Sequence, residues 1–255
     1  MKRSELVGFL DAQFAELMKN TDASNNGLQV VGREEVKKAA FAVDACQSTF
    51  RMAAEQGADF VFAHHGISWG GGIRFVTGYN AGRIGLLMRN DISLYAMHLP
   101  LDGHPVIGNN AVLADLLGIP ASGREGFCFC NGLTIGCGGA MQQERTAAEL
   151  AAFLDQALDT KCSVYDFAGR KIRRVAIVSG GGAFAIDEAV AKGYDCLLTG
   201  EMGHANYHYA EEQGLTVIAA GHYATETTGP RAVMKVVQER FPSLECLFVD
   251  NPTGL

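Results

Sequence analysis

Residues 41–65 read FAVDACQSTFRMAAEQGADFVFAHH, and this stretch decides the fold. It opens with an apolar strand at 41–44, continues through an amphipathic helix at 48–55, and closes on a second apolar run that ends in two histidines. Gly57 follows the helix, where a left-handed C-cap is typical. The order predicts a strand–helix–strand unit with two parallel strands that are buried on both faces.

A second stretch of the chain repeats this order. Residues 175–201 read VAIVSGGGAFAIDEAVAKGYDCLLTGE, with a strand at 175–178, a helix near 183–191 and another apolar strand. A third strand follows in each half, at 91–98 and at 215–222. We therefore predict an α/β protein of two related halves, produced by internal duplication. The halves are expected at 1–125 and 126–255, intertwined in one compact two-part chain.

The remaining segments complete this architecture. Small residues at 127–135 predict a strand or hairpin. Thr146, with Glu149 three residues later, forms a capping-box pattern before an apolar helical stripe. A helix at about 230–240 and a strand at 245–249 close the chain.

Composition excludes several classes of function. The 255 residues carry a net charge of −7, which argues against nucleic-acid binding because phosphates require clustered cations. No apolar run approaches the length of a membrane span, and the N-terminal residues do not resemble a signal peptide. The seven cysteines are scattered in apolar contexts, as in a reduced, cytoplasmic protein.

The pair His64–His65 ends a buried strand. Neighbouring residues on a regular strand point to opposite faces, but Gly66 allows the backbone to bend so that both rings reach one region. Two metal ions about 3.5–4 Å apart would use one histidine each. Sites in open α/β sheets gather at the carboxyl ends of strands, which is where this pair lies.

Each half also carries a histidine followed four residues later by a carboxylate, just beyond its third strand. These pairs are His98 with Asp102 and His222 with Glu226. Two neighbouring cations require a bridging carboxylate, and the candidates for it are Asp102, Glu201 and Glu226. Imidazole and carboxylate without thiolate suit zinc, iron, manganese, nickel or cobalt in an open, water-containing site.

Three further segments have two interpretations each. His204 and His208 share a helix face, where they are ligands or, as we prefer, flank the site as substrate contacts or proton shuttles. Asn25–Asn26–Gly27 predicts a tight turn, and alternatively places an asparagine in the site. Residues 179–184, SGGGAF, follow a strand and open a helix, which suits anion binding but is an incomplete nucleotide fingerprint.

Five ordered motifs resemble the YbgI-like proteins, also called GTP cyclohydrolase 1 type 2 homologs: NNGLQV, HHGISW, YAMHLPLDGHPVIGNNAVLADLLG, LLTGEMGHANYHYAEEQG and AAGHYATET. The resemblance runs from about residue 20 to the C-terminus. It implies a two-part α/β fold, a dinuclear metal site in the cleft between the halves, and a ring-shaped homohexamer. It also implies the metal ligands His64, His65, Asp102, His222 and Glu226, with Glu226 bridging. We then expect His98 to lie behind the ligands and to orient Asp102.

The resemblance implies a hydrolase that holds two divalent cations and acts on a nucleotide-like or cyclic amide substrate through a metal-bridged hydroxide. Its physiological substrate is a small molecule that the sequence does not identify, and no catalytic side chain beyond the ligands is indicated. The alternative is a metal-loaded ring that serves as a scaffold, or as a regulatory or interaction protein without turnover. The absence of a phosphate loop motivates this second hypothesis.

Overall fold

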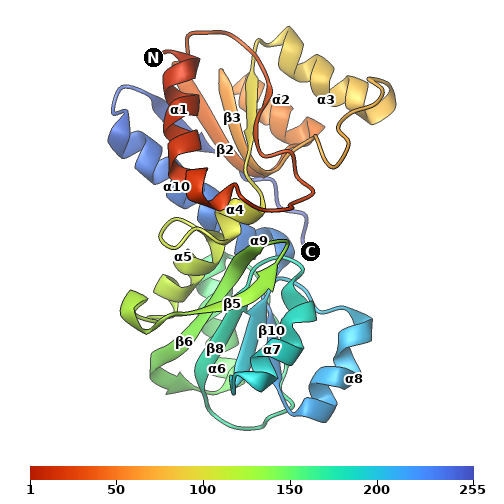
Figure 1. The fold of residues 1–255 in the computed structure, drawn as a ribbon, viewed down its shortest axis with the longest axis vertical. Helices are drawn as coiled ribbons and strands as arrows, with labels where there is room; N and C mark the ends of the chain where they lie inside the picture. The colour runs from red at the N-terminus through yellow and green to blue at the C-terminus, as the bar shows by residue number, and fades with distance from the viewer. The chain divides into compact units, whose positions relative to one another are not determined.

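The computed structural model describes residues 1–255, which form two compact units. The first comprises Met1–Leu101 and Gly229–Asn251, and the second comprises Asp102–Thr228 and Pro252–Leu255. The helices are α1 (Arg3–Phe14), α2 (Gln47–Glu55), α3 (Gly78–Arg89), α4 (Leu99–Asp102), α5 (Asn109–Leu116), α6 (Ala147–Leu158), α7 (Ile186–Ala191), α8 (His204–Gln213), α9 (His222–Glu226) and α10 (Thr228–Arg240) (Figure 1). None of them combines the length and the apolar character that a membrane crossing requires.

The first unit is built on a five-stranded sheet in the order β1-β4-β3-β2-β11. Its strands are β1 (Gly27–Val30), β2 (Lys38–Asp44), β3 (Phe60–His65), β4 (Ser93–Ala96) and β11 (Glu245–Phe248). β2, β3, β4 and β11 are parallel, and β1 is antiparallel to β4. Helices α1 and α10 lie on one face, and α2 and α3 on the other (Figure 1).

The two faces of this sheet pack differently because side chains alternate along each strand. Toward α2 and α3 the strands present mainly small aliphatic residues, and Phe50 of α2 fills the space against them. The opposite face carries an aromatic row in which Phe62 lies 5.8 Å, centroid to centroid, from both Phe41 and Tyr95. The hydroxyl of Tyr95 donates a 2.9 Å hydrogen bond to Asp11 of α1, which fixes that helix over the row.

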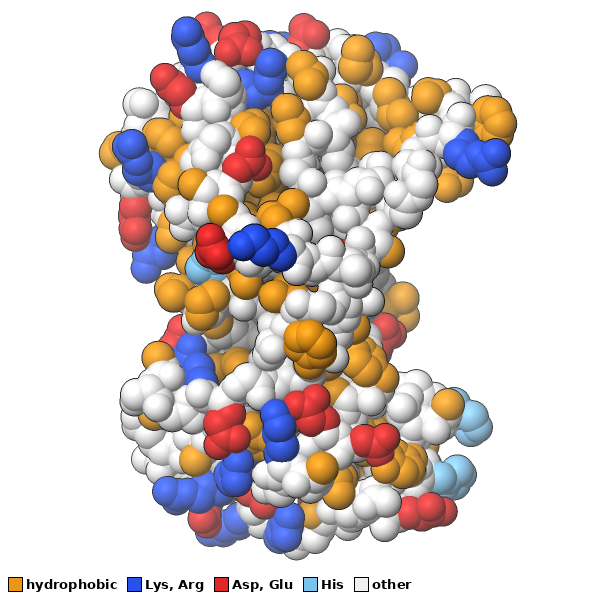
Figure 2. Space-filling model, in the orientation of Figure 1, with side chains coloured by type: hydrophobic (Ala, Val, Ile, Leu, Met, Phe, Trp, Pro, Cys, Tyr) orange, Lys and Arg blue, Asp and Glu red, His pale blue; other side chains and the backbone are white.

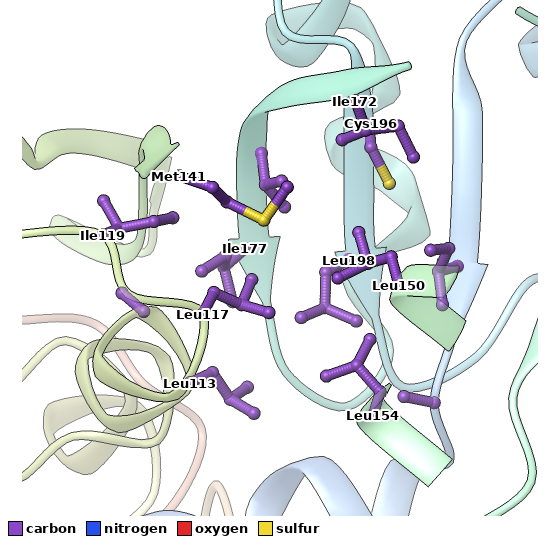
Figure 3. Close-up of a cluster of buried hydrophobic side chains, with 14 of the residues drawn as sticks. Leu113, Leu117, Ile119, Met141, Leu150, Leu154, Ile172, Ile177, Cys196 and Leu198 are labelled. Atoms are coloured by element: carbon purple, nitrogen blue, oxygen red, sulfur yellow. The ribbon is translucent and has the colours of Figure 1, made fainter. Parts of the chain in front are cut away.

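The second unit contains a six-stranded sheet in the order β5-β6-β8-β9-β10-β7. Its strands are β5 (Glu125–Cys130), β6 (Leu133–Arg145), β7 (Ser163–Tyr165), β8 (Ile172–Val178), β9 (Cys196–Thr199) and β10 (Thr216–Ala219). β8, β9 and β10 are parallel, and β5, β6 and β7 pair antiparallel with their neighbours. Figure 3 shows the core on one face, where Leu150 and Leu154 of α6 meet Ile177 and Leu198 of the sheet.

The capping box predicted before α6 is confirmed. The Thr146 hydroxyl accepts a 3.2 Å hydrogen bond from the Glu149 amide, and the Glu149 carboxylate accepts one of 2.8 Å from the Thr146 amide. We expect Thr146→Ala to lower the free energy of unfolding by about 1 kcal/mol, because one helix-end amide loses its acceptor. Urea unfolding beside Thr146→Ser measures this, and equal losses in both variants would contradict the capping role.

The two-part α/β fold is confirmed, and both units follow one element order. In the first, α1-β1-β2-α2-β3-α3-β4 gives the sheet order β1-β4-β3-β2, and in the second, α6-β7-β8-α7-β9-α8-β10 gives β7-β10-β9-β8. In each case the strand that precedes the parallel core turns back to pair antiparallel with the last parallel strand. The predicted helix at 183–191 is divided into a 3₁₀ turn, Gly182–Ala185, and α7.

The segment that follows each repeated set of elements in the sequence belongs to the other compact unit. α5 and the β5–β6 hairpin follow the first repeat but belong to the second unit, and most of α10 with β11 follow the second repeat but belong to the first. The sequence-based division at residues 125 and 126 therefore differs from the compact units. Residues 102–125 lie in the second unit, where Leu113 of α5 and Leu117, the residue that follows this helix, are buried in the core (Figure 3).

Candidate metal centre

The adjacent histidines at the end of β3 do come together, although they occupy successive positions on a strand. Their ring centroids are 4.6 Å apart. His64 is fully buried, and its Nδ1 lies 3.0 Å from the carbonyl oxygen of Met97. His65 Nδ1 lies 2.8 Å from an oxygen of Asp44, the residue opposite it at the end of β2. Both rings are thus oriented through Nδ1.

Gly66 is required directly after this pair. A Cβ atom there would lie 2.4 Å from the Gln29 amide nitrogen and 2.6 Å from the Ala96 side chain. Gln29 itself accepts hydrogen bonds from the backbone amides of Ile67 and Ser68, at 2.8 and 3.2 Å. The strand end is therefore held in a shape that a larger residue would disturb.

His98 joins the same group from the end of β4. Its ring centroid lies 5.2 Å from that of His64 and 5.5 Å from that of His65. The ring is held by Asp22, whose carboxylate oxygen is 2.9 Å from Nδ1. Burial alone would raise the pKa of Asp22, but hydrogen bonds from His98 and Asn26 outweigh it and lower the pKa to about 2. Asp22 is therefore an ionised carboxylate in a protein interior.

The asparagine turn takes part in this arrangement. The Asn26 side chain accepts a 2.7 Å hydrogen bond from the backbone amide of His98 and donates one of 3.0 Å to Asp22. Asn25 donates a 2.8 Å hydrogen bond to the Ser68 hydroxyl. The segment before β1 thus supports His98. Residues 25 and 26 are irregular, and Gly27, with a φ of +110°, begins the strand.

In the second unit, His222 stands between two carboxylates. Its Nδ1 lies 2.8 Å from Glu201, and its Nε2 lies 3.2 Å from Glu226, one turn later on α9. The hydrogen bond with Glu226 raises the pKa of His222 to about 9, against the opposing effect of burial, and Glu201 adds to the rise. A metal ion that takes Nε2 must therefore displace a proton at neutral pH.

Asp102 is buried and held by neutral donors. One of its oxygens accepts hydrogen bonds from the Asn109 amide at 2.8 Å and from the Ser179 hydroxyl at 3.0 Å. Both donors belong to the second unit. Asn109 and Ser179 therefore position Asp102, while the ring of His98 is oriented by Asp22. The orienting of Asp102 by His98 stays a prediction.

The glycine-rich turn after β8 supports Glu226. Gly180 has a φ of +60°, and a Cβ atom on it would lie 2.2 Å from a Glu226 oxygen and 3.0 Å from His222 Nε2. Thr199 fixes the turn, because its hydroxyl accepts from the Gly182 amide at 2.9 Å and donates to the Gly180 carbonyl at 3.1 Å. With a carboxylate against it, this turn favours the support of Glu226 over the binding of an anion.

His204 and His208 lie exposed on α8, where histidine side chains are visible at the surface (Figure 2). His208 Nδ1 is 3.1 Å from Glu211 on the same helix. Their predicted role beside the site stays a prediction.

The donor atoms in each unit suit a divalent metal ion. In the first unit, His64, His65 and His98 offer ligand atoms within 4.8 Å of one another. In the second, the 3.2 Å between His222 Nε2 and the Glu226 oxygen matches two ligands of one ion, each about 2.0–2.2 Å from it. Every one of these histidines also has an oxygen acceptor at Nδ1, the arrangement that orients metal-binding histidines.

Sequence reasoning missed the two aspartates that hold the rings. Asp44 could have been found, because it ends the strand that neighbours His65. Asp22 carries no such signal, since it lies in an irregular segment far from His98 in the sequence.

Fold and site together define a two-part α/β protein with histidine and carboxylate groups able to bind metal. The model of the family Duf34/NIF3 (NGG1p interacting factor 3) matches residues 1–253, and the chain belongs to this family. Among its relatives, proteins named GTP cyclohydrolase 1 type 2 homolog from Pyrococcus horikoshii and Pyrococcus abyssi are 46% and 44% identical, each over the full length of both chains.

Solved structures agree with this assignment. The chain is similar to protein ybgI, described as of unknown function, with a TM-score of 0.91 and 37% identity over the whole of both chains. It is also similar to reduced HcgD from Methanocaldococcus jannaschii, with a TM-score of 0.83 and 29% identity over 98% of each chain. The family resemblance read from the five motifs is thereby confirmed.

Proposed function

We propose that this protein is a dinuclear metal-dependent hydrolase that acts on a nucleotide-like or cyclic amide substrate. In this proposal the two ions are held by five ligands: His64, His65, Asp102, His222 and Glu226. The observation that carries it is a pair of possible metal ligands on α9, just after β10: His222 Nε2 and a Glu226 oxygen lie 3.2 Å apart, and Glu201 contacts the other ring nitrogen of His222. The names of the relatives support the substrate class.

The ions, when bound, would supply Lewis-acid activation of water and of the substrate. The chain's own residues do the rest. Asp44 and Glu201 each hold a histidine Nδ1, so Nε2 would be the ligand atom of each ring. Asn109 and Ser179 hold one oxygen of Asp102, which limits the carboxylate to one orientation. Burial of Glu226 and Asp102, at 4% and 6% exposure, keeps competing water from both.

Metal content per chain tests this proposal. Tag-free protein purified without chelator is expected to carry about two divalent ions per chain, as in other two-metal sites. Glu226→Ala should fall to one ion or fewer, because the bridging ligand is lost. Glu212→Ala is the matched control, since Glu212 is exposed on α8. Wild-type protein that binds no metal, even after reconstitution, would overturn the proposal.

A hydrolysis screen then tests the reaction. The metal-loaded protein is offered nucleotides, cyclic amides and phosphoesters, with Glu226→Ala as the negative control. Turnover that disappears in the variant supports the hydrolase. Full metal loading without turnover on any of these classes would overturn the hydrolase and favour a metal-loaded scaffold or regulatory protein.

We also propose that the chain assembles as a homohexamer, as the family resemblance implies. Its support in the structure is a group of exposed apolar side chains on α3 and the segment before it, among them Phe75, Val76 and Tyr79 at 71%, 58% and 67% exposure. Apolar side chains reach the surface in this region (Figure 2). Exposed apolar patches are typical of interaction sites. Sedimentation velocity should give about six times the 27.2 kDa of one chain, and a monomer would contradict the assembly.

A further inference from the structure

Trp69 is the only tryptophan of the chain, and it lies beside the histidines at the strand ends of the first unit. Its ring centroid is 5.0 Å from that of His98 and 6.3 Å from that of His65. The planes of Trp69 and His98 are nearly perpendicular, at 73°, so these two rings meet edge to face. The indole is therefore close enough to His65, a proposed metal ligand, for one small substrate to contact both.

The indole is also open to solvent. Trp69 is 37% exposed, whereas Phe62 and Tyr95 of the aromatic row in the same unit are fully buried. A single exposed apolar side chain is ordinary on a protein surface and indicates nothing by itself. What separates Trp69 from an ordinary surface residue is the way in which its ring is held.

Both the side chain and the backbone of Trp69 are fixed. The indole N–H donates a 2.9 Å hydrogen bond to the Gly66 carbonyl. The backbone forms a β-bridge with Ser24, and next to it the Gly70 amide donates a 2.6 Å hydrogen bond to the Ala23 carbonyl. The ring has thus lost its freedom before a ligand arrives, and this pre-organisation lowers the entropy cost of binding.

The same hydrogen bond determines which chemistry the ring offers to a ligand. The indole nitrogen is a donor only, and Gly66 takes its single hydrogen, so π-faces and C–H edges remain. A π-face stacks on any planar ring, because every nucleobase has such a face, whereas a saturated, puckered ring cannot lie flat on it. The chain has no phosphate loop, and its glycine-rich turn after β8 lies against the Glu226 carboxylate. Recognition of a nucleotide through its ring is therefore favoured over recognition through its phosphates.

We propose that Trp69 is a substrate-binding residue that stacks on a planar, unsaturated nitrogen heterocycle of the nucleobase type. The proposal narrows the substrate class given above, since it favours the nucleotide-like ring over a saturated cyclic amide. It rests on the proposed hydrolase for the reaction, but the binding that it predicts can be measured without turnover and without metal.

The test compares two nucleotides that differ in one ring bond. Uridine monophosphate has a planar ring, and dihydrouridine monophosphate has the same phosphate, ribose, ring carbonyls and ring N–H on a saturated, puckered ring. The full chain is titrated with each, both metal-loaded and stripped by a chelator. Calorimetry gives the affinity in every variant, and wild-type fluorescence reports on Trp69 directly because the chain has no other tryptophan.

Three substitutions separate stacking from simple apolar contact. They are Trp69→Phe, which keeps a π-face, Trp69→Leu, which keeps apolar area without one, and Trp69→Ala, which removes both. The matched control is Phe129→Ala, since Phe129 is an aromatic residue of β5 that is 73% exposed. Circular dichroism and ions per chain are measured for each variant, so that a fold or metal defect is recognised.

We expect Trp69→Ala and Trp69→Leu to bind uridine monophosphate about 5- to 100-fold more weakly than wild type, the loss usual when a stacking aromatic is removed. Trp69→Phe and Phe129→Ala should stay close to wild type. The wild-type chain should prefer the planar nucleotide over the puckered one, and this preference should vanish in Trp69→Leu. Metal content should be unchanged in all four variants, because the indole is not a ligand.

Several results would overturn the inference. Equal affinity of the wild-type chain for the two nucleotides, or no binding of either, would show that no planar ring is recognised. Equal behaviour of Trp69→Phe and Trp69→Leu would show that the π-face is not used, and this comparison decides the matter if Trp69→Ala fails to fold. Loss of metal in Trp69→Phe would make the ring a support for the histidines instead.

Failure of the proposed hydrolase gives a different result. A chain without bound metal or without turnover, but with a preference for the planar nucleotide that depends on Trp69, would overturn the hydrolase and support the stacking role. A chain with two ions and turnover, but with no effect of Trp69→Leu on either nucleotide, would leave the hydrolase in place and overturn the stacking role.

Discussion

Gly180→Ala is expected to lower the metal affinity of the His222–Glu226 group about 10- to 100-fold, an effect typical of lost support around a ligand. The new Cβ atom would lie 2.2 Å from the Glu226 oxygen and 3.0 Å from His222 Nε2, so either the carboxylate or the turn must move. The turn resists movement, because Thr199 binds it on both sides. Metal titration of the stripped variant measures the loss.

Gly193→Ala is the matched control. Gly193 has nearly the same left-handed φ, +66° against +60°, but no atom lies within 4 Å of the position its Cβ would take. Both variants should lose about 1–2 kcal/mol of folding free energy from the backbone conformation. Only Gly180→Ala should lose metal. Equal metal affinity in the two variants would contradict the role assigned to the glycine turn.

The parallel core was predictable because its signals are local. Within each stretch, the continuous apolar runs and the glycine after the helix lie within about 30 residues of one another, the size of one strand–helix–strand unit. The same order then recurs in the second stretch. The exchange of segments was not predictable in the same way. α5 is largely buried and α10 buries one face, and an apolar pattern shows that a helix is buried without showing against which sheet it packs.

The sequence pattern suggests that His98–Asp102 and His222–Glu226 occupy equivalent positions in the two halves, but the strand register shows that they differ by one residue. Ala63 lies opposite Ala96 in the first sheet, and Thr199 lies opposite Ala219 in the second. Ala96 and Ala219 are therefore equivalent positions of the two sheets. His98, two residues after Ala96, is equivalent to Gly221. His222, three residues after Ala219, is equivalent to Leu99. Consistent with this register, α4 begins at Leu99 and α9 at His222. The two histidines therefore occupy different places, which fits their different partners, Asp22 and Glu226.

The histidines themselves were found from the sequence, but what orients them was largely not. A histidine at the end of a buried strand is a visible signal, because a polar ring interrupts an apolar run. A carboxylate that binds Nδ1 from a distant loop leaves no periodic trace. Asp22 and His98 are 76 residues apart, so their contact is a property of the folded chain alone.

Chelation is expected to lower the melting temperature of the wild-type protein by about 10 °C. A ligand at 1,000 times its dissociation constant stabilises the native state by about 4 kcal/mol, and each kcal/mol corresponds to about 2–4 °C in a chain of this size. Thermal unfolding with and without chelator measures the change. Glu226→Ala, which removes the ligand proposed to bridge the two ions, should shift by less than half as much.

The change in melting temperature on chelation should depend on pH, and the protonation of His222 determines whether it grows or shrinks as the pH rises. Without metal, the hydrogen bond with Glu226 raises the pKa of His222 from 6.5 to about 9, with Glu201 facing the other ring nitrogen. The stabilisation from protonated His222 is complete below pH 6.5 and is lost as the pH rises through 9. Metal competes with that proton, so metal affinity should rise roughly tenfold per pH unit over this window. The effect of chelation should therefore grow from pH 6.5 to 9, and a constant shift would show that His222 does not bind the ion.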